Sequence, residues 1–350
     1  MDFRNFTAGH NDHGRRLDKV ARKFLSGVAL SVIYKSIRSG FIKVNGTKKS
    51  PDSKIKEGDT LKIADFLLKN MPSNDDFSGV PALKNDMILF KNDFLIVINK
   101  PYDMQVQQSK NGELSLDKIV FFDALRGKSG AFSSDFKGQS LSFKPGPLHR
   151  LDKKTTGAIV FSQNLEGAKW FSFALQTHKI KKTYLAIVKG KLRENRIWKD
   201  KIFLNNEEKN GSGGQKFHTV AVEKEVKIGS ENKKNADDFR FKDAETQVFP
   251  LGFGRYKNTD FTFVKFEIKT GRKHQIRAQS AHHGFPLLGD TAYGCEKIFE
   301  KQDFFLHSFV IDFPIDNPCG MPRAVKCEIN NNFENFLERF LINKEAIFII

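Results

Sequence analysis

Short apolar segments of strand length recur along most of this chain, and they constrain its fold more than any other feature. In residues 261–268, apolar and polar side chains alternate in the way that a β-strand places them on opposite faces of a sheet. Two amphipathic segments, 165–178 and 333–341, predict helices. We therefore expect a large domain that mixes strands and helices. The other strand-like segments lie at 87–90, 94–98, 158–161, 183–190, 244–249 and 305–313.

A second unit is predicted in the first 64 residues. Apolar residues at helical spacing follow Arg15, and a shorter helix is expected over 31–39, ended by Gly40 as C-cap. A strand over 41–44 then runs into Asn45-Gly46, a strong hairpin turn signal. Residues 15–62 hold 13 Lys and Arg against four Asp and Glu, so this unit is basic.

These patterns divide the chain into four parts. We expect a tail over 1–14, the basic module over 15–64, a linker over 65–86 rich in Pro, Ser, Asn and Asp, and the large domain over 87–350. Inside the large domain, the polar stretches 126–146 and 223–238 are interpreted as surface loops.

The charge balance predicts the kind of partner. The chain carries 58 Lys and Arg against 41 Asp and Glu, a formal net charge of +17. Nucleic acid is the first candidate partner and an anionic membrane surface the second. The sequence has no apolar run long enough to span a bilayer and no apolar leader near its first residue, so we expect a cytoplasmic protein. Three cysteines outside CxxC spacing agree with a reducing compartment.

One carboxylate stands out within residues 147–163, PLHRLDKKTTGAIVFSQ. Asp152 lies among four potential cations, just before an apolar strand. Such an acid is either half of an ion pair at a turn, or an ionised group held for nucleophilic or base chemistry. A second basic motif, TGRKHQIR, follows at 270–277. The sequence contains no Walker loop, GxGxxG, HExxH, GxSxG or Cys/His cluster, so nucleotide, dinucleotide, zinc and serine-hydrolase chemistry lack support.

Several blocks together resemble the RluA-type pseudouridine synthases. The block HRLDKKTTG at 149–157 is similar to the HRLDxxTSG motif of that family. Four more blocks follow the family's order, and the layout looks most like the RluC branch, which modifies 23S ribosomal RNA of the large subunit. These blocks are DFLIVINKP at 93–101, KTYLAIVKG at 182–190, TGRKHQIRAQSAHHGFPLLGDTAYG at 270–294 and LHSFVIDFP at 306–314.

The resemblance implies a fold for each unit. The large domain would have the pseudouridine synthase fold, an α+β arrangement with a mixed, mainly antiparallel sheet flanked by helices. The segments RLDKVARKFL, SVIYKSIRSGFIKVNG and IKEGDTLKI make residues 15–64 resemble the small α/β RNA-binding module of a small-subunit ribosomal protein and of tyrosyl-tRNA synthetases.

The resemblance also implies roles for individual residues. Asp152 matches the catalytic aspartate, which attacks C6 of uracil, attacks C1′ of the ribose, or removes a ribose proton. Tyr184 matches the tyrosine that stacks on the extruded base and assists removal of the C5 proton. Arg277 matches the basic residue that pairs with the aspartate, and Arg150 a residue that fills the space left by the extruded uridine. Base flipping is expected because the reacting atoms are inaccessible within a stack.

The remaining expectations concern binding. The reaction is an isomerisation, so neither cofactor nor metal is implied, and we expect a monomer without an obligate protein partner. A non-catalytic ribosome-assembly factor, or a synthase for transfer or messenger RNA, are the alternatives. In KPYDMQVQ, Asp103 and Gln107 replace the usual Gly and His of the family. The residues expected to contact RNA are His149, Arg150, Arg16, Arg22, Lys23, Lys35, Arg38, Lys43, Arg272, Lys273 and His274.

Overall fold

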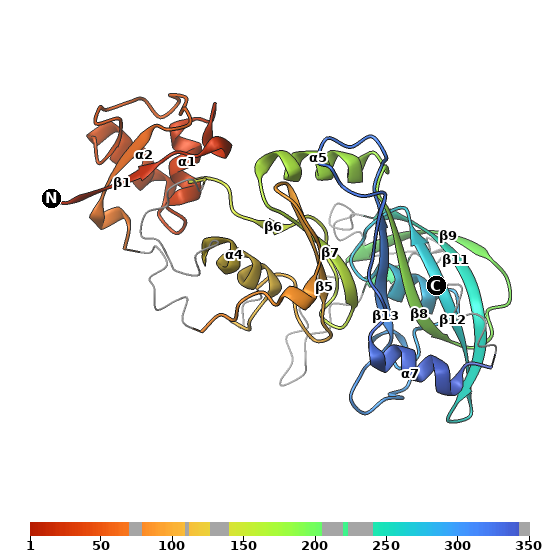
Figure 1. Ribbon diagram of the computed structural model, residues 1–350. Helices are drawn as coiled ribbons and strands as arrows, with labels where there is room; N and C mark the ends of the chain where they lie inside the picture. The colour runs from red at the N-terminus through yellow and green to blue at the C-terminus, as the bar shows by residue number, and fades with distance from the viewer. Residues whose placement is uncertain (70–78, 109–111, 127–139, 205–219, 223–240, 343–350) are drawn as a thin grey trace, which may run out of the picture.

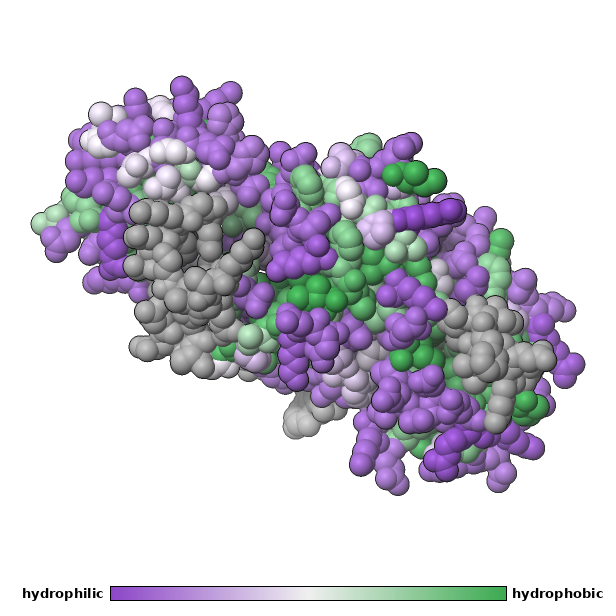
Figure 2. Space-filling model, viewed as in Figure 1, coloured by the Kyte–Doolittle hydropathy of each residue, from purple (hydrophilic) through white to green (hydrophobic). Residues whose placement is uncertain are grey.

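The computed structural model describes residues 1–69, 79–108, 112–126, 140–204, 220–222 and 241–342. Figure 1 shows a small N-terminal unit and a larger one built on a long sheet. In Figure 2 the visible surface of the small unit is mostly hydrophilic, whereas hydrophobic residues gather toward the middle of the molecule. Within the described residues, no helix combines the length and the apolar character that a membrane crossing requires.

The N-terminal unit packs two helices on a three-stranded sheet. Apolar side chains at helical and alternate spacing, such as Leu17, Val20, Ile33 and Ile63, are fully buried between these layers. The elements are β1 (Phe3–Thr7), α1 (Leu17–Phe24), α2 (Leu30–Ser39), β2 (Ile42–Val44) and β3 (Thr60–Ala64), with the strands in the order β1-β3-β2. Gly40 ends α2 with φ of 77°, as predicted, because a left-handed C-cap favours glycine.

The predicted tail over residues 1–14 is wrong. Strand β1 pairs antiparallel with β3, and Phe6 packs against Phe24 with ring centroids 4.6 Å apart. The polar residues around Phe6 concealed this edge strand in the sequence, because only one of its five side chains is buried.

A buried carboxylate attaches the small unit to the large one. Asp12 is fully buried and accepts hydrogen bonds from the backbone amides of Leu141 and Ser142, at 2.8 and 2.9 Å, and from both serine hydroxyls of residues 140 and 142. The Leu141 side chain enters the core of the small unit. The end of the predicted 126–146 loop is therefore an anchored strap, while residues 127–139 of that prediction lie outside the described residues.

The large unit is organised by one sheet of eleven strands. Its main path runs β10-β9-β11-β12-β8-β13-β7-β5-β4, with β14 beside β13 and β6 beside β7. Every pairing is antiparallel except β7 with β13, so the predicted mainly antiparallel α+β fold is confirmed. The strands are β4 (Ile88–Lys91), β5 (Leu95–Lys100), β6 (Gly146–Pro147), β7 (Thr156–Ser162), β8 (Lys181–Lys189), β9 (Arg196–Leu204), β10 (Val220–Val222), β11 (Lys242–Tyr256), β12 (Thr259–Ile268), β13 (Leu306–Asp312) and β14 (Ala324–Lys326).

Helices cover both faces of this sheet, and strand alternation decides which side chain meets which helix. In β8, Tyr184, Ala186 and Val188 face the core that contains α4 (Leu116–Arg126) and Ile276 of α6 (Gln275–His282). The intervening Leu185 and Ile187 face a phenylalanine-rich core under α7 (Asn331–Phe340). Helix α5 (Leu165–Gln176) packs beside β5 and β7 on that second face (Figure 1).

Several element boundaries differ from the sequence prediction. The strand predicted over 244–249 ends before Pro250, which lacks an N–H. In the structure β11 continues through Pro250, because a register shift between Pro250 and Gly252 accommodates the proline. Strand β9 and helix α4 were not predicted. Helix α6 begins at Gln275, inside the basic motif TGRKHQIR of residues 270–277. The segment 223–238, and most of 205–237, lie outside the described residues.

Candidate active site

A buried lysine, Lys100, holds the loop that carries Asp152 through a hydrogen bond to the loop backbone. Lys100, at the end of β5, is fully buried, and its Nζ donates to the carbonyl oxygens of Pro101, Met104 and Lys153 at 2.7 to 3.0 Å. Burial lowers the pKa of Lys100 to about 7, while the nearby Asp152 and the three acceptors favour its ammonium form. The bond to Lys153 fixes the backbone directly beside Asp152.

A glycine allows this loop to enter the sheet. Gly157 in β7 has φ of 103°, and a Cβ there would lie 2.3 Å from the carbonyl oxygen of Ser308 in β13. Only glycine fits so close an approach at this backbone angle. The Thr-Gly pair of the motif thus brings β7 beside β13, with Asp152 in the loop just before the start of β7.

Asp152 lies near Arg277 and His274, and neither is within hydrogen-bond distance. Its side chain is 15% exposed, with Oδ2 3.6 Å from Nη1 of Arg277 and Oδ1 3.5 Å from Nε2 of His274. Burial lowers the pKa of His274 to about 4, so this imidazole is neutral near pH 7. Nδ1 of His274 lies 2.8 Å from the Tyr293 hydroxyl. Among the described residues, Arg277 is thus the permanent cation within ion-pair distance of the Asp152 carboxylate, and neither it nor His274 makes a short hydrogen bond to the carboxylate oxygens.

The shortest bonds of Arg277 go to a different acid, Asp290. Its Nε and Nη2 donate to the two oxygens of Asp290 at 2.7 and 2.8 Å, and the Asp290 side chain is 2% exposed. The guanidinium also lies 4.8 Å from the Tyr293 ring and 4.7 Å from the Phe304 ring. The sequence singled out Arg277 but not Asp290, which reads as an ordinary turn residue in LLGDTAYG.

Tyr184 forms the wall of the same site. It is 5% exposed, and burial, with a smaller contribution from the charge of Asp152, raises the pKa of its hydroxyl above its usual value. The hydroxyl is therefore protonated and uncharged at physiological pH.

The pocket around these residues is small, and a larger groove adjoins it. The pocket has a volume of about 50 Å³ and is lined by Asp152, Tyr184, His274 and Arg277 among others. The groove has a volume of about 600 Å³ and shares Arg150, Tyr184 and Arg272 with the pocket. Arg150 is exposed and lies where the pocket and the groove meet.

Lys182 is a site residue that the sequence did not single out. It precedes Tyr184 by two residues, so both project from the same face of β8 into the groove. It is 4% exposed, burial lowers its pKa to about 8, and no described residue accepts a hydrogen bond from its Nζ or forms an ion pair with it. A buried and unpartnered cation at the floor of a groove is a marker of anion recognition.

Two residues expected to contact RNA have other roles in the structure. Nε2 of His149 accepts a hydrogen bond from the Val160 amide at 3.0 Å, its ring stacks beside Phe171, and burial lowers its pKa to about 3. The half-buried His149 also lines the groove, so its proposed contact with RNA stays a prediction, and a neutral imidazole there could act through a hydrogen bond but not through charge. His274 belongs with Asp152, as described above.

The other cations expected to contact RNA form two groups. Arg150 and Arg272 line both the pocket and the groove, and Lys273 is close enough to Asp152 and His274 to interact with them electrostatically. Arg272 also donates to the Asp243 carbonyl. In the small unit, Arg22 and Lys23 line a groove of about 550 Å³ together with three further cations, Arg15, Lys19 and Lys144.

The remaining cations of the small unit differ in whether another side chain already contacts them. Lys35 and Arg38 are exposed on α2, and Lys43 lies over the Phe3 ring. Arg16 makes a two-point ion pair with Asp18, at 2.9 and 3.1 Å, which leaves it less free than its neighbours.

The backbone accounts for one departure from the family pattern. Asp103, where the family usually has glycine, adopts φ of 62°, a left-handed conformation that Asp tolerates better than most residues. Its carboxylate lies 2.8 Å from Nζ of Lys154, and this ion pair links the Lys-Pro turn to the loop of Asp152.

Comparison with known proteins identifies the class to which this fold and site belong. The family model for RNA pseudouridylate synthase matches residues 94–282, more than half of the chain. The chain belongs to this family and is an RNA pseudouridine synthase, an isomerase.

Particular relatives are similar over most of their length. The ribosomal large subunit pseudouridine synthase C of Haemophilus influenzae is 28% identical over 88% of this chain and 86% of that protein. The protein of the same name from Yersinia pestis is 26% identical over 95% of this chain and 93% of its own, and that of Escherichia coli K12 is 26% identical over 87% and 86%. The structure of human RNA pseudouridylate synthase domain containing 4 shares the fold, with a TM-score of 0.51, 19% identity, and coverage of 73% of this chain and 94% of that one.

Proposed function

We propose that this enzyme isomerises specific uridines of 23S ribosomal RNA to pseudouridine, with Asp152 as the catalytic carboxylate and with the target base extruded from its stack. The observation that carries this proposal is the convergence of Asp152, Tyr184 and Arg277 on one pocket, from the loop before β7, from β8 and from α6. The choice of substrate rests on the relatives named for large-subunit RNA, which match both units of this chain.

The geometry supports a division of roles. Arg277 is fixed by Asp290, so it stabilises the negative charge of Asp152 from 3.6 Å without occupying its lone pairs. Asp152 can then attack C6 or C1′, or remove a ribose proton; the resemblance leaves these routes open. In each route the N1–C1′ bond breaks, the uracil turns, C5 bonds to C1′, and the proton lost from C5 is balanced by one gained at N1.

Tyr184 would act as a neutral ring. Its raised pKa disfavours a tyrosinate that is ready to remove the C5 proton, so stacking on the uracil is its primary role in this proposal. The phenol can still pass a proton onward once a neighbouring acceptor is in place, because a hydroxyl both donates and accepts.

Binding would use the basic surfaces of both units. Contacts of Lys and Arg with phosphates position an enzyme without reading bases, and they release counterions. We propose that the cations of α1 and α2, together with Lys144 of the strap, hold the RNA while Arg150 and Arg272 border the flipped nucleotide. We propose further that a cytoplasmic monomer without a cofactor performs this reaction.

The direct test is Asp152→Asn, with the exposed and distant Asp316→Asn as the matched control. Pseudouridine in a large-subunit RNA fragment is mapped by chemical probing, and RNA affinity is measured in parallel. We expect Asp152→Asn to abolish product formation while affinity changes less than threefold, and Asp316→Asn to match the wild type. Full activity in Asp152→Asn would disprove the catalytic assignment. Normal ribosomal pseudouridines in a deletion strain, with defective subunit assembly, would favour the assembly-factor alternative.

A further inference from the structure

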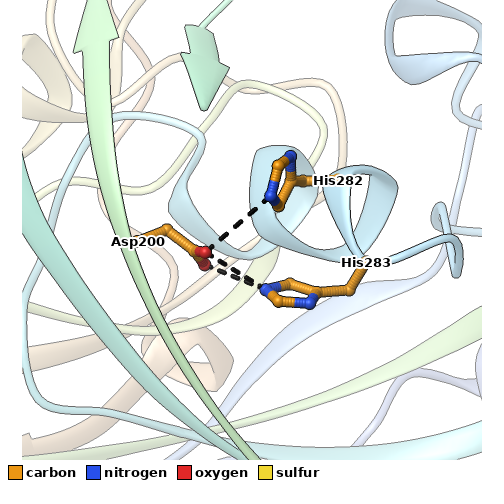
Figure 3. A group of neighbouring side chains, drawn as sticks. All are labelled: Asp200, His282 and His283. Carbon is orange, nitrogen blue, oxygen red and sulfur yellow. Dashed lines mark hydrogen bonds and ion pairs between the residues drawn. The ribbon is translucent and has the colours of Figure 1, made fainter. Parts of the chain in front are cut away.

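A cluster of two imidazoles and one carboxylate lies outside the active site, at the opposite end of the helix that carries Arg277. Figure 3 shows His282 and His283, at the end of α6, turned toward Asp200 of β9. Nε2 of His283 is 3.1 Å from Oδ2 and 3.3 Å from Oδ1 of Asp200, and Nε2 of His282 is 4.0 Å from Oδ1. The role proposed above uses none of these three residues.

The geometry is close to that of a coordinated transition metal. Zinc binds imidazole nitrogen at about 2.0–2.1 Å and carboxylate oxygen at about 2.0–2.2 Å, so ligand atoms around a tetrahedral ion lie about 3.3 Å apart. Two of the three side chains already meet this spacing, and all of the candidate ligand atoms lie within 4.8 Å of one another. To complete the set, Nε2 of His282 would have to come closer than its present 4.0 Å from Oδ1, and at 24% exposure its side chain has room to move.

The surroundings of Asp200 also favour a cation. Its side chain is 9% exposed, and among the described residues only the two imidazoles lie within ion-pair distance of it. Gln279 donates to Oδ2 at 2.6 Å and orients the carboxylate, as a supporting residue does beside a metal ligand. The indole of Trp198 stacks on the His283 ring, with centroids 4.7 Å apart and planes 5° apart, and fixes its direction.

We propose that Asp200, His282 and His283 bind one divalent transition-metal ion of the zinc type, with water in the fourth position. Two nitrogens and one oxygen suit zinc and its neighbours, whereas magnesium and calcium require oxygen ligands. Both histidine side chains are about a quarter exposed, which leaves an entry path from solvent. The other arrangement open to these groups is a plain His–Asp hydrogen bond without metal.

The ion would connect the end of α6 to β9. Helix α6 carries Arg277, and His274 caps its first turn, so a brace at His282 and His283 would hold the helix on the sheet. This inference is independent of the proposed RNA substrate. It assigns the metal a positioning role, because none of the three ligands lines the pocket of Asp152.

The test uses full-length, untagged protein stripped of metal with a chelator. Calorimetric titration with Zn²⁺ should give one ion per chain, and Zn²⁺ should raise the melting temperature by several degrees while Mg²⁺ has no effect. Asp200→Asn and His282→Gln should each weaken Zn²⁺ binding by at least about 10–100-fold. His282→Gln is the second variant because the His282 side chain is more exposed than that of Asp200, so its replacement should leave the fold intact.

His10→Gln is the matched control, because the His10 side chain lies on the small unit and is 81% exposed. We expect the His10→Gln protein to bind Zn²⁺ as the wild type does. The variants also separate this site from the three buried cysteines, which remain in every one of them. The proposal is overturned if wild-type protein binds less than half an equivalent of Zn²⁺. It is equally overturned if Asp200→Asn and His282→Gln bind Zn²⁺ as tightly as His10→Gln does.

Discussion

Replacing Arg277 by lysine isolates the part of the site that is specific to a guanidinium. The change keeps the positive charge but removes the planar fork that grips Asp290 at 2.7 and 2.8 Å. Lysine can retain one of these bonds, and it loses most of the contact with the rings of Tyr293 and Phe304.

The magnitude follows from these contacts. One lost charge-assisted hydrogen bond costs about 1.5–3 kcal/mol, and weakened cation–π contacts cost about 0.5–2 kcal/mol more. We expect the free energy of unfolding to fall by about 2–5 kcal/mol, measured by urea denaturation. The matched control Arg339→Lys, at an exposed position of α7, should change it by less than about 0.5 kcal/mol.

The effect on activity separates a positioning role from a structural one. A lysine drawn toward Asp290 moves away from Asp152, so we expect kcat to fall at least about 100-fold while KM for the RNA changes little. The assay is single-turnover pseudouridine formation at a temperature where the variant remains folded. If Arg277→Lys is destabilised as expected but keeps kcat within threefold of the wild type, Arg277 acts on the fold alone and the reasoning about Asp152 fails.

Three further perturbations follow from buried charges. Lys100→Met leaves three backbone carbonyls without a donor, so it should lower the free energy of unfolding by about 3–5 kcal/mol. We expect this variant to lose more activity than RNA affinity. An unchanged free energy of unfolding in urea would contradict the reasoning. Lys182→Met should keep or raise the free energy of unfolding, but it should weaken RNA binding and lower the salt slope of that binding by about one. Because the pKa of Lys182 is about 8, the contribution of Lys182 to wild-type RNA affinity should disappear as pH rises through that value. A wild-type RNA affinity that is constant between pH 7 and 9 would argue against this role. Asp12→Asn should release the strap, seen as loss of hydrogen-exchange protection at the amides of Leu141 and Ser142, and retained protection would show that the strap is held by other contacts.

Local patterns were sufficient for much of the fold. The alternation in 261–268 and the apolar run of 183–190 predicted strands that the structure contains as β12 and β8, and Gly40 marked the end of α2. Prediction failed where tertiary context overrides local signals. Pro250 continues a strand because of a register shift in its pairing, and Phe6 completes a sheet with a partner more than fifty residues away.

The candidate site was predicted as a set of residues but not as a set of contacts. Asp152, Tyr184 and Arg277 were named from motifs, and the structure brings them to one pocket. The contacts of Asp290 with Arg277 and of His274 with Asp152, and the position of Lys182 in the groove, could not be assigned, because they depend on strand register and on the start of α6. His149 shows the same limit: the motif predicts a cation beside RNA, whereas in the structure its Nε2 accepts a hydrogen bond from the Val160 amide and its imidazole is neutral.

The division of Arg277 between two carboxylates has a chemical consequence for the proposed reaction. A carboxylate that must form a bond or remove a proton needs an unoccupied lone pair, and strong hydrogen bonds to a guanidinium would make it less nucleophilic. Here the buried Asp290 takes both short bonds, so contacts within the protein are enough to anchor the cation. Asp152 receives the field of that charge at 3.6 Å and keeps its oxygens for the substrate. The cation that the sequence suggested beside Asp152 is therefore Arg277, which acts on Asp152 through its charge at 3.6 Å. The hydrogen-bonded ion pair of Arg277 is made with Asp290.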